Sequence, residues 1–248
     1  MSRPAASRAA HPPFRLLAIS QLATLPGAGA GGGSRGGTGT GSSGGASAGG
    51  AGAGDPSGAS RGDAAIGWFA ALAAAGVDAL QLREKHLDDL DLWRLARSAR
   101  AAFPRPAVLL VNGRADVALA AGAEGVHLPA EGVPAAALRA RFGGGLLIGV
   151  STHRLEEVER ARRDGADYVV FGPVYETPAK AAHGAPAGTR VLARAAALGI
   201  PVYALGGVTL DRFDEVAAAG AAGIAGIRLF QGLPALERVV AASRACFS

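Results

Sequence analysis

Short apolar segments alternate along this chain with longer segments whose apolar residues recur every three or four positions. The segment 168–171 is typical, because its apolar run stops at Gly172-Pro173 and leads into a polar loop that reaches Lys180. Runs that are nearly continuous in apolar residues, and that are separated by helical patterns, are typical of buried strands in a parallel sheet. The pattern therefore predicts an α/β fold in which each strand is followed by a helix.

The regular part of the chain holds eight such units. Strands are expected at residues 14–19, 79–83, 107–111, 125–128, 146–150, 167–171, 201–205 and 223–227. Helices are expected at residues 64–75, 87–103, 114–121, 133–141, 155–163, 187–197, 210–219 and 233–244. Eight units predict a single (β/α)8 TIM barrel. An open doubly wound sheet is the alternative, but no G-x-G-x-x-G motif follows the first strand.

A weak internal repeat supports this count. A glycine ends the helix that precedes the second, fourth, sixth and eighth strands, at Gly76, Gly122, Gly165 and Gly220. Glycine adopts the left-handed conformation that ends a helix at little cost, so its recurrence marks the same junction each time.

Two segments stand apart from the regular pattern. Residues 1–13 contain arginines, alanines and prolines without an acid, which is interpreted as a disordered tail with a transit peptide as the alternative. From residue 27 to residue 63 the chain is almost only Gly, Ala, Ser and Thr, which buries too little apolar surface to offset the entropy of ordering. We therefore expect a TIM-barrel domain over residues 14–248, interrupted by a disordered Gly-rich insertion at 27–63 after the first strand.

The place of this insertion leaves its role open. A loop after the first strand lies on the active-site face of a barrel, which would suit a lid, whereas a tolerated low-complexity expansion is the simpler interpretation. A phosphate-binding loop is rejected, because the stretch contains no lysine and no G-x-x-x-x-G-K-[ST] motif.

The composition excludes several classes of protein. No apolar run is long enough to cross a bilayer, so no membrane partner is expected. The net charge is +5, but the arginines are scattered and aromatic residues make up 5%, which argues against a nucleic-acid partner and favours a small anionic substrate. The single cysteine, Cys246, excludes an internal disulfide and a Cys-based metal site, and it favours a reducing, cytoplasmic location.

Catalytic groups of a TIM barrel lie at the C-terminal ends of its strands. The residues expected there are mostly cations and hydrogen-bond donors: Arg83, Lys85, Asn112, His127, Ser151, His153, Thr177, Lys180, Gly206, Gly207 and Arg228. The carboxylates that could join them are few: Glu84, Glu131 and Glu176. This set favours an anionic substrate, predicts no divalent metal site and argues against glycoside hydrolysis, which needs two carboxyl groups.

The expected catalytic residues are His153, Arg83 and Lys85. His153 stands at the mouth end of the fifth strand, and imidazole is a common acid and base, although a histidine at the entry to the next helix is the alternative. Arg83 and Lys85 are two positions apart after an apolar strand, so both can face one side, and Lys85 is one of only two lysines. A solvated charge pair is the alternative for these two residues.

The remaining candidates are expected to bind substrate. Gly206 and Gly207 follow the seventh strand, and Ile227 and Arg228 follow the eighth, which is where many barrels bind phosphate. A plain turn is the alternative for the two glycines. The predicted set is completed by Asn112, Ser151, Thr177 and Lys180, with a helix cap as the alternative for Asn112 and a plain loop hydroxyl for Thr177. The other histidines are interpreted as structural or loop residues: His86, His127 and His183.

Four segments resemble the thiamine phosphate synthase/TenI superfamily. They are Q-L-R-E-K at 81–85, G-A-E-G-V-H-L at 122–128, G-A-D-Y-V-V-F-G-P-V at 165–174 and I-P-V-Y-A-L-G-G-V at 200–208. The resemblance covers essentially the whole chain outside the tail and the insertion. It implies a TIM barrel, an enzyme of thiamine biosynthesis and a homo-oligomer.

The sequence departs from the synthase branch of that superfamily. A synthase joins a pyrimidine pyrophosphate to a thiazole phosphate with Mg²⁺, and its pattern has aspartates where this chain has Gly113 and Gly132. Glu131 is one residue out of register, and the T-x-T-K clamp of the synthases reads T-P-A-K at 177–180. Each departure removes a group that pyrophosphate chemistry uses.

Other segments are similar to the TenI branch, which includes a metal-independent thiazole tautomerase. They are N-G-R at 112–114, L-P at 128–129, R-A-R-F at 139–142 and Ser151-x-His153. The resemblance therefore implies aromatising tautomerisation of a carboxythiazole phosphate without a metal or other cofactor. His153 would move the proton, and Arg83 and Lys85 would hold the carboxylate and the developing charge.

Two alternatives stay open at this point. The first is a thiamine phosphate synthase, for which Mg²⁺ would be the cofactor. The second is a non-catalytic barrel that binds thiazole phosphate or a protein partner.

Overall fold

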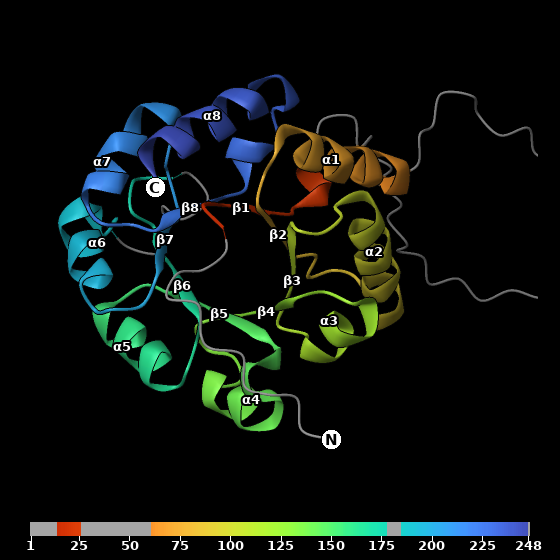
Figure 1. The fold of residues 1–248 in the computed structure, drawn as a ribbon, viewed down its shortest axis with the longest axis horizontal. Coiled ribbons are helices and arrows are strands. Elements are labelled where there is room, and N and C mark those ends of the chain that lie inside the picture. The colour runs from red at the N-terminus through yellow and green to blue at the C-terminus, as the bar shows by residue number, and fades with distance from the viewer. Residues whose placement is uncertain (1–13, 26–60, 178–184, 248) are drawn as a thin grey trace, which may run out of the picture.

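The computed structural model describes residues 14–25, 61–177 and 185–247 (Figure 1). The expected tail at 1–13, most of the expected insertion, Lys180 and His183 lie outside the described residues. The strands are β1 (Leu16–Ile19), β2 (Ala79–Leu82), β3 (Val108–Asn112), β4 (Gly125–Leu128), β5 (Leu147–Thr152), β6 (Tyr168–Phe171), β7 (Val202–Ala204) and β8 (Gly223–Gly226). They form a closed barrel in sequence order, with β8 pairing in parallel with β1. The predicted TIM barrel is confirmed.

The helices form a ring outside the strands (Figure 1). They are α1 (Arg61–Ala75), α2 (Asp89–Ala102), α3 (Ala115–Ala121), α4 (Ala135–Phe142), α5 (Leu155–Arg163), α6 (Gly188–Ala196), α7 (Phe213–Ala218) and α8 (Leu236–Cys246). Among the described helices, none has the length and apolar character needed to cross a membrane.

Some element boundaries were predicted wrongly. Helix α1 begins at Arg61, so residues 61–63, which were assigned to the insertion, are helical. Asp63 lies in the first turn of α1, where a carboxylate interacts favourably with the helix dipole. The expected helices at 210–219 and 233–244 each begin with a three-residue 3₁₀ turn before the α-helix starts. In the second of these the turn contains a proline, which has no backbone N–H to donate.

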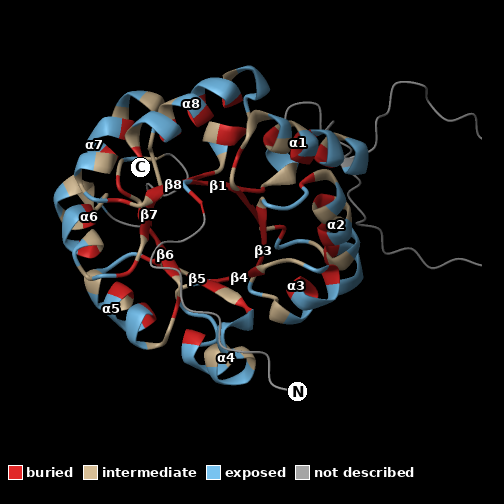
Figure 2. Cartoon of the chain, in the orientation of Figure 1, coloured by how far each residue is buried: buried red, intermediate tan, exposed pale blue. Residues whose placement is uncertain are grey.

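The strands separate two apolar cores. Residues such as Leu16, Leu80 and Leu109 face outward and pack between the barrel and its helices. Their neighbours along the strands, such as Leu17 and Leu110, face inward and fill the barrel. Figure 2 shows the same division, with buried residues on the strands and on the inner sides of the helices. The alternation follows from the two-residue period of a strand.

Three aromatic side chains occupy the barrel interior. The ring of Phe14 lies 5.1 Å from that of Tyr168 and 4.7 Å from that of Tyr203, and the two tyrosine rings are 5.4 Å apart. Glycines on the neighbouring strands make room for them. A Cβ atom at Gly149 would overlap the phenol of Tyr168, and one at Gly223 would lie 2.8 Å from the Tyr203 ring. Each buried ring contributes about 2 kcal/mol of apolar stabilisation.

Carboxylates close the N-terminal end of the barrel. Each lies two residues after a helix-ending glycine: Asp78, Glu124 and Asp167. Asp78 accepts hydrogen bonds from the N–H groups of Arg15 and Leu16 at 2.9 and 3.0 Å. Glu124 and Asp167 accept in the same way from Leu109 and Ile148 at 2.8 and 2.7 Å. At three of the four glycines of the repeat, the acid two residues later therefore satisfies N–H groups at the start of the preceding strand, whereas Gly220 is followed there by Ala222.

Candidate active site

The C-terminal ends of β4 and β5 bring His127 and Ser151 together. The Nε2 atom of His127 lies 2.9 Å from Oγ of Ser151, and its Nδ1 atom lies 3.1 Å from the hydroxyl of Tyr168. The His127 residue is 2% exposed, whereas Ser151 is half-buried at the barrel mouth. His127 was expected to be structural. It is buried, but both of its ring nitrogens contact polar groups, one of them a predicted site residue.

Burial and a neighbouring cation keep His127 uncharged. Removal from water, followed by the positive charge of Arg83, lowers the pKa of His127 to about 3. Arg83 follows β2, and its charge acts on this imidazole through space. A cation and a hydroxyl at these strand ends suit an anionic ligand.

His153 is exposed immediately beyond the end of β5. Its backbone N–H donates to a Glu157 carboxylate oxygen at 2.6 Å, and its Nδ1 atom contacts the carbonyl oxygen of Gly172, just beyond β6. A carbonyl can only accept a hydrogen bond, so Nδ1 carries the proton. In the neutral imidazole Nε2 is then the basic nitrogen, which is the form that a general base requires.

Glu84 is not one of the mouth carboxylates. It is buried, and its Oε1 atom accepts hydrogen bonds from the Ser20 hydroxyl at 2.5 Å and from the Leu22 N–H at 3.1 Å. It therefore joins the loops that follow β1 and β2. On either side of it, Arg83 is half-buried and Lys85 is exposed.

The predicted phosphate-binding residues meet on the opposite side of the mouth. A guanidinium nitrogen of Arg228 donates to the Thr177 hydroxyl at 3.0 Å, joining the loops after β8 and β6. Gly206 and Gly207 have φ values of 94° and 66°, which favour glycine. A Cβ atom at Gly206 would lie 2.7 Å from Pro173, so packing against the β6 loop already requires a small residue there. Ile227 packs against the apolar core inside the barrel.

Tyr175 fastens the loop after β6 to the loop after β7. Its hydroxyl donates to Glu215 at 2.8 Å, and the Arg212 guanidinium lies 4.2 Å from its ring centroid. Arg212 also donates to the Gly207 carbonyl at 2.7 Å. Burial and the Glu215 carboxylate raise the pKa of Tyr175 to about 12. These contacts hold the backbone at Gly207 in place.

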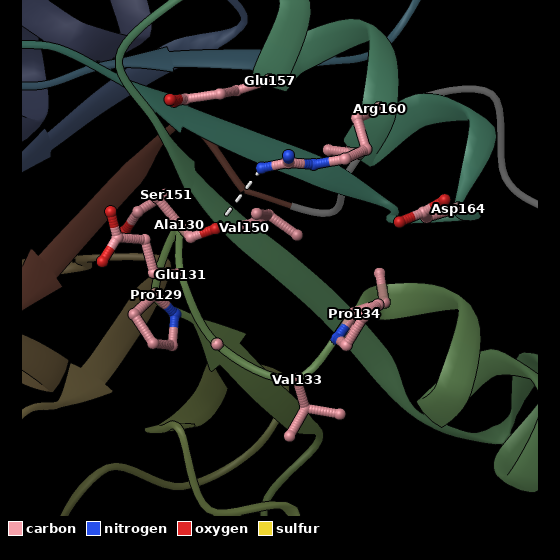
Figure 3. Close-up of a pocket in the computed structure, with 13 residues that line it drawn as sticks. Pro129, Ala130, Glu131, Val133, Pro134, Val150, Ser151, Glu157, Arg160 and Asp164 are labelled. Carbon is pink, nitrogen blue, oxygen red and sulfur yellow. Dashed lines mark hydrogen bonds between the residues drawn. The ribbon is translucent and has the colours of Figure 1, made fainter.

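A pocket of about 320 Å³ lies between the β4–α4 loop and helix α5 (Figure 3). Its charged lining residues are Glu131, Glu157, Arg160 and Asp164. Arg160 reaches from α5 toward the Ala130 carbonyl, at 3.5 Å. Ser151 is the predicted site residue that lines this pocket, so the pocket adjoins the mouth at β5 and extends outward from it.

The sequence matches the family described as thiamine monophosphate synthase over residues 56–230. This match covers most of the chain. The chain belongs to that family. The match begins after β1, so the first strand is placed by its pairing with β2 and β8 instead.

Relatives carry related names. A protein of Geobacter sulfurreducens, provisionally named as a thiamine-phosphate synthase, is 51% identical over 154 residues, which span 61% of this chain and 72% of the relative. The thiamine-phosphate synthase of Chlorobium luteolum is 43% identical over 153 residues, which span 60% of this chain and 72% of that protein. A solved structure, the thiamine phosphate pyrophosphorylase of Pyrococcus furiosus, superposes with a TM-score of 0.72. It is 24% identical over 95% of this chain and 98% of the other, and so supports the fold.

Magnesium, which the synthase branch uses, does not fit the described residues at this mouth. The positions after β3 and β4 that would supply aspartates are Gly113 and Gly132, and a Cβ atom at Gly132 would lie 2.9 Å from Pro129. Glu131 is exposed in the same loop. In residues 14–25, 61–177 and 185–247 no three His, Cys, Asp or Glu side chains are grouped as a metal site. Oxygen ligands for a hard cation are therefore not assembled here.

Two contributors were not singled out from the sequence. Tyr168 was treated as part of an apolar strand. It lies two residues before Val170, so both side chains face the barrel interior, whereas Phe171 faces outward. Glu157, near the start of α5, accepts a hydrogen bond from the backbone N–H of His153, and no feature of the sequence indicated this contact. Asn112 ends β3 and pairs in register with His127, as its place among the strand ends suggested.

Proposed function

We propose that this protein is an enzyme of thiamine biosynthesis that acts on a thiazole phosphate. Family membership and the names of the relatives support the pathway. The observation that carries the substrate class is the ring of donors at the mouth. This set consists of Arg83 after β2, Ser151 beside His127, and the Arg228 and Thr177 pair, whereas the Glu84 carboxylate accepts hydrogen bonds from the loop after β1.

The first candidate reaction is the one in the relatives' names, coupling of a pyrimidine pyrophosphate to the thiazole phosphate. The donors at the mouth would bind the pyrophosphate oxygens and orient the leaving group. Mg²⁺ would serve this reaction by neutralising pyrophosphate charge, but the described side chains do not form a site for it. The relatives' names and the donors favour this candidate, whereas Gly113 and Gly132, at the positions expected for metal-binding aspartates, do not.

The second candidate is tautomerisation of a carboxythiazole phosphate, and the geometry of His153 favours it. The basic Nε2 atom would remove the proton from the ring carbon beside the carboxylate. The electron pair moves through the ring, and a proton is delivered to the exocyclic carbon, so the reaction is a balanced isomerisation without an oxidant. Arg83 and Lys85 would bind the carboxylate and stabilise its developing charge.

One pair of assays separates these candidates. The purified chain and His153→Ala are given the carboxythiazole phosphate tautomer with EDTA, and separately pyrimidine pyrophosphate plus thiazole phosphate with Mg²⁺. Metal-dependent coupling assigns the synthase reaction. Turnover in EDTA that His153→Ala abolishes assigns the tautomerase reaction. If the wild type binds thiazole phosphate but catalyses neither reaction, the barrel is a binding protein and the proposal of an enzyme is wrong.

A further inference from the structure

A chain of hydrogen bonds leads from the sealed interior of the barrel to its mouth. It starts at the hydroxyl of Tyr168, passes through both ring nitrogens of His127 and ends at Oγ of Ser151, with distances of 3.1 and 2.9 Å. Tyr168 is 0% and His127 2% exposed, whereas Ser151 is half-buried. Only the last group of the chain can therefore reach a ligand.

The direction of donation follows from counting protons. A neutral imidazole has one N–H, so His127 donates from either Nε2 or Nδ1. If Nδ1 donated, it would do so to the Tyr168 oxygen, and the Tyr168 hydroxyl hydrogen would have no acceptor among the described residues. The rings around that phenol are Phe14 and Tyr203. A buried donor without an acceptor is unfavourable.

The opposite direction satisfies every group. The Tyr168 hydroxyl donates to Nδ1 of His127, and the Nε2–H donates to Oγ of Ser151. One acceptor position of Ser151 is then filled from inside the barrel, and its own O–H is left to donate into the mouth.

We propose that Tyr168 and His127 are positioning residues that hold Ser151 as a hydrogen-bond donor to an anionic oxygen of the substrate. The identity of that substrate as a phosphate or pyrophosphate of the thiamine pathway rests on the proposed function. The direction of the relay does not. The positive charge of Arg83 acts on the same imidazole and suits a phosphate or carboxylate oxygen, although Glu131 and Glu157 line the pocket beside Ser151.

Two features of the barrel maintain this arrangement. Burial and the charge of Arg83 disfavour a protonated His127, which would donate from both nitrogens and reverse the Tyr168 contact. Gly149 provides the space for the Tyr168 phenol, because any side chain there would overlap the ring.

The direction is tested first by nitrogen NMR on the full-length protein with ¹⁵N-labelled histidine. The signal of His127, among five histidines, is identified by its loss in His127→Gln. We expect the Nε2–H form in the wild type and a mixture of both forms in Tyr168→Phe, which can no longer donate to Nδ1. A wild type in the Nδ1–H form overturns the proposal, whatever the enzyme's activity.

The consequence for binding is tested with inorganic pyrophosphate by calorimetry. Tyr168→Phe is expected to weaken binding about threefold to tenfold, the range of one hydrogen bond, and to have no further effect in a Ser151→Ala background. Tyr203→Phe is the matched control, because it removes a phenol hydroxyl of the same barrel interior that contacts the Phe14 carbonyl instead. It should leave binding unchanged.

Three results would overturn the relay: equal losses from Tyr168→Phe with and without Ser151, the same loss from Tyr203→Phe, or no binding of pyrophosphate by the wild type. The Nε2–H form with non-additive binding, but no turnover in either assay, would support the relay and reject the proposed function. Turnover by a wild type in the Nδ1–H form would support the proposed function and reject the relay.

Discussion

The hydroxyl of Ser20 donates a hydrogen bond of 2.5 Å to the carboxylate of Glu84, across the ends of β1 and β2. The same hydroxyl oxygen accepts a hydrogen bond of 2.9 Å from the backbone N–H of Arg83. Through Ser20, the carboxylate thus holds the backbone of Arg83, which is one of the predicted catalytic residues. It also anchors Leu22, which precedes the segment between residues 26 and 60.

Glu84→Ala should mainly lower the free energy of unfolding, because Glu84 acts as a structural residue and not as a catalytic one. It leaves the buried Ser20 hydroxyl and the half-buried Leu22 N–H without this acceptor, which costs about 2–4 kcal/mol for the pair. Urea denaturation measures this loss. Glu156→Ala, an exposed acid on α5, is the control and should change stability by less than about 0.5 kcal/mol. Equal stability of the two variants would contradict the structural role of Glu84.

His153→Ala should mainly lower turnover and have only a small effect on stability. The side chain is exposed and its loss removes one hydrogen bond to the Gly172 carbonyl, so the free energy of unfolding should fall by no more than about 1 kcal/mol. If the imidazole transfers a proton, turnover of the carboxythiazole tautomer should fall by about 10²–10⁴-fold. Steady-state kinetics and urea denaturation on the same preparation check both parts. A stable variant with wild-type turnover would remove His153 from the mechanism.

Gly149→Ala and Gly67→Ala should change stability in opposite directions. A methyl group at Gly149 would overlap the Tyr168 ring inside a packed barrel, and such overpacking costs about 1–3 kcal/mol. Gly67 lies exposed in α1 with nothing within 4 Å of an added Cβ atom, so alanine there should stabilise the helix by about 0.5–1 kcal/mol. Thermal unfolding measures both. Stabilisation by Gly149→Ala would show that the Tyr168 ring can move aside.

Acid should destabilise the fold through His127. Its pKa is about 3 in the folded protein and about 6.5 when unfolded, so between these values the unfolded state binds the extra proton. Stability attributable to this group is complete above about pH 6.5 and is lost as the pH falls, by up to about 1.4 kcal/mol per pH unit.

Urea denaturation at about pH 7, 6 and 5 tests this effect. His127→Gln has no ionisable group at this position and should show a shallower fall in stability over that range. The comparison of slopes is independent of how much the substitution itself destabilises the barrel. Parallel slopes for the two proteins would contradict a neutral buried imidazole.

The alternation of apolar strands with amphipathic helices was enough to predict the barrel. Each strand must be buried on both faces, and only helices outside and side chains inside can cover eight parallel strands. The prediction was wrong at some ends, as at Arg61, because a helix can continue into a low-complexity segment that shows no apolar period. The role of Lys180 and the disorder expected for residues 27–60 of the insertion stay predictions, because these residues lie outside the described part of the chain.

The sequence also determined which residues stand at the strand ends, but the roles of several were decided by tertiary structure. Glu84 and His153 looked alike, each a polar residue after an apolar strand. Glu84 turns into the β1 loop because the Ser20 hydroxyl and the Leu22 N–H meet it there, and His153 stays exposed with Nδ1 on the Gly172 carbonyl. These partners are distant in sequence and are set by strand register.

The relay from Tyr168 to Ser151 illustrates the same limit. The two-residue period of a strand predicts that Tyr168 and His127 face the barrel interior, but it does not predict that their polar atoms meet. That contact depends on the pairing of β4, β5 and β6, and on the absence of a side chain at Gly149. The pattern of apolar residues in one strand indicates which face each residue occupies. Hydrogen bonds between side chains of different strands form only when the closed barrel brings those strands together.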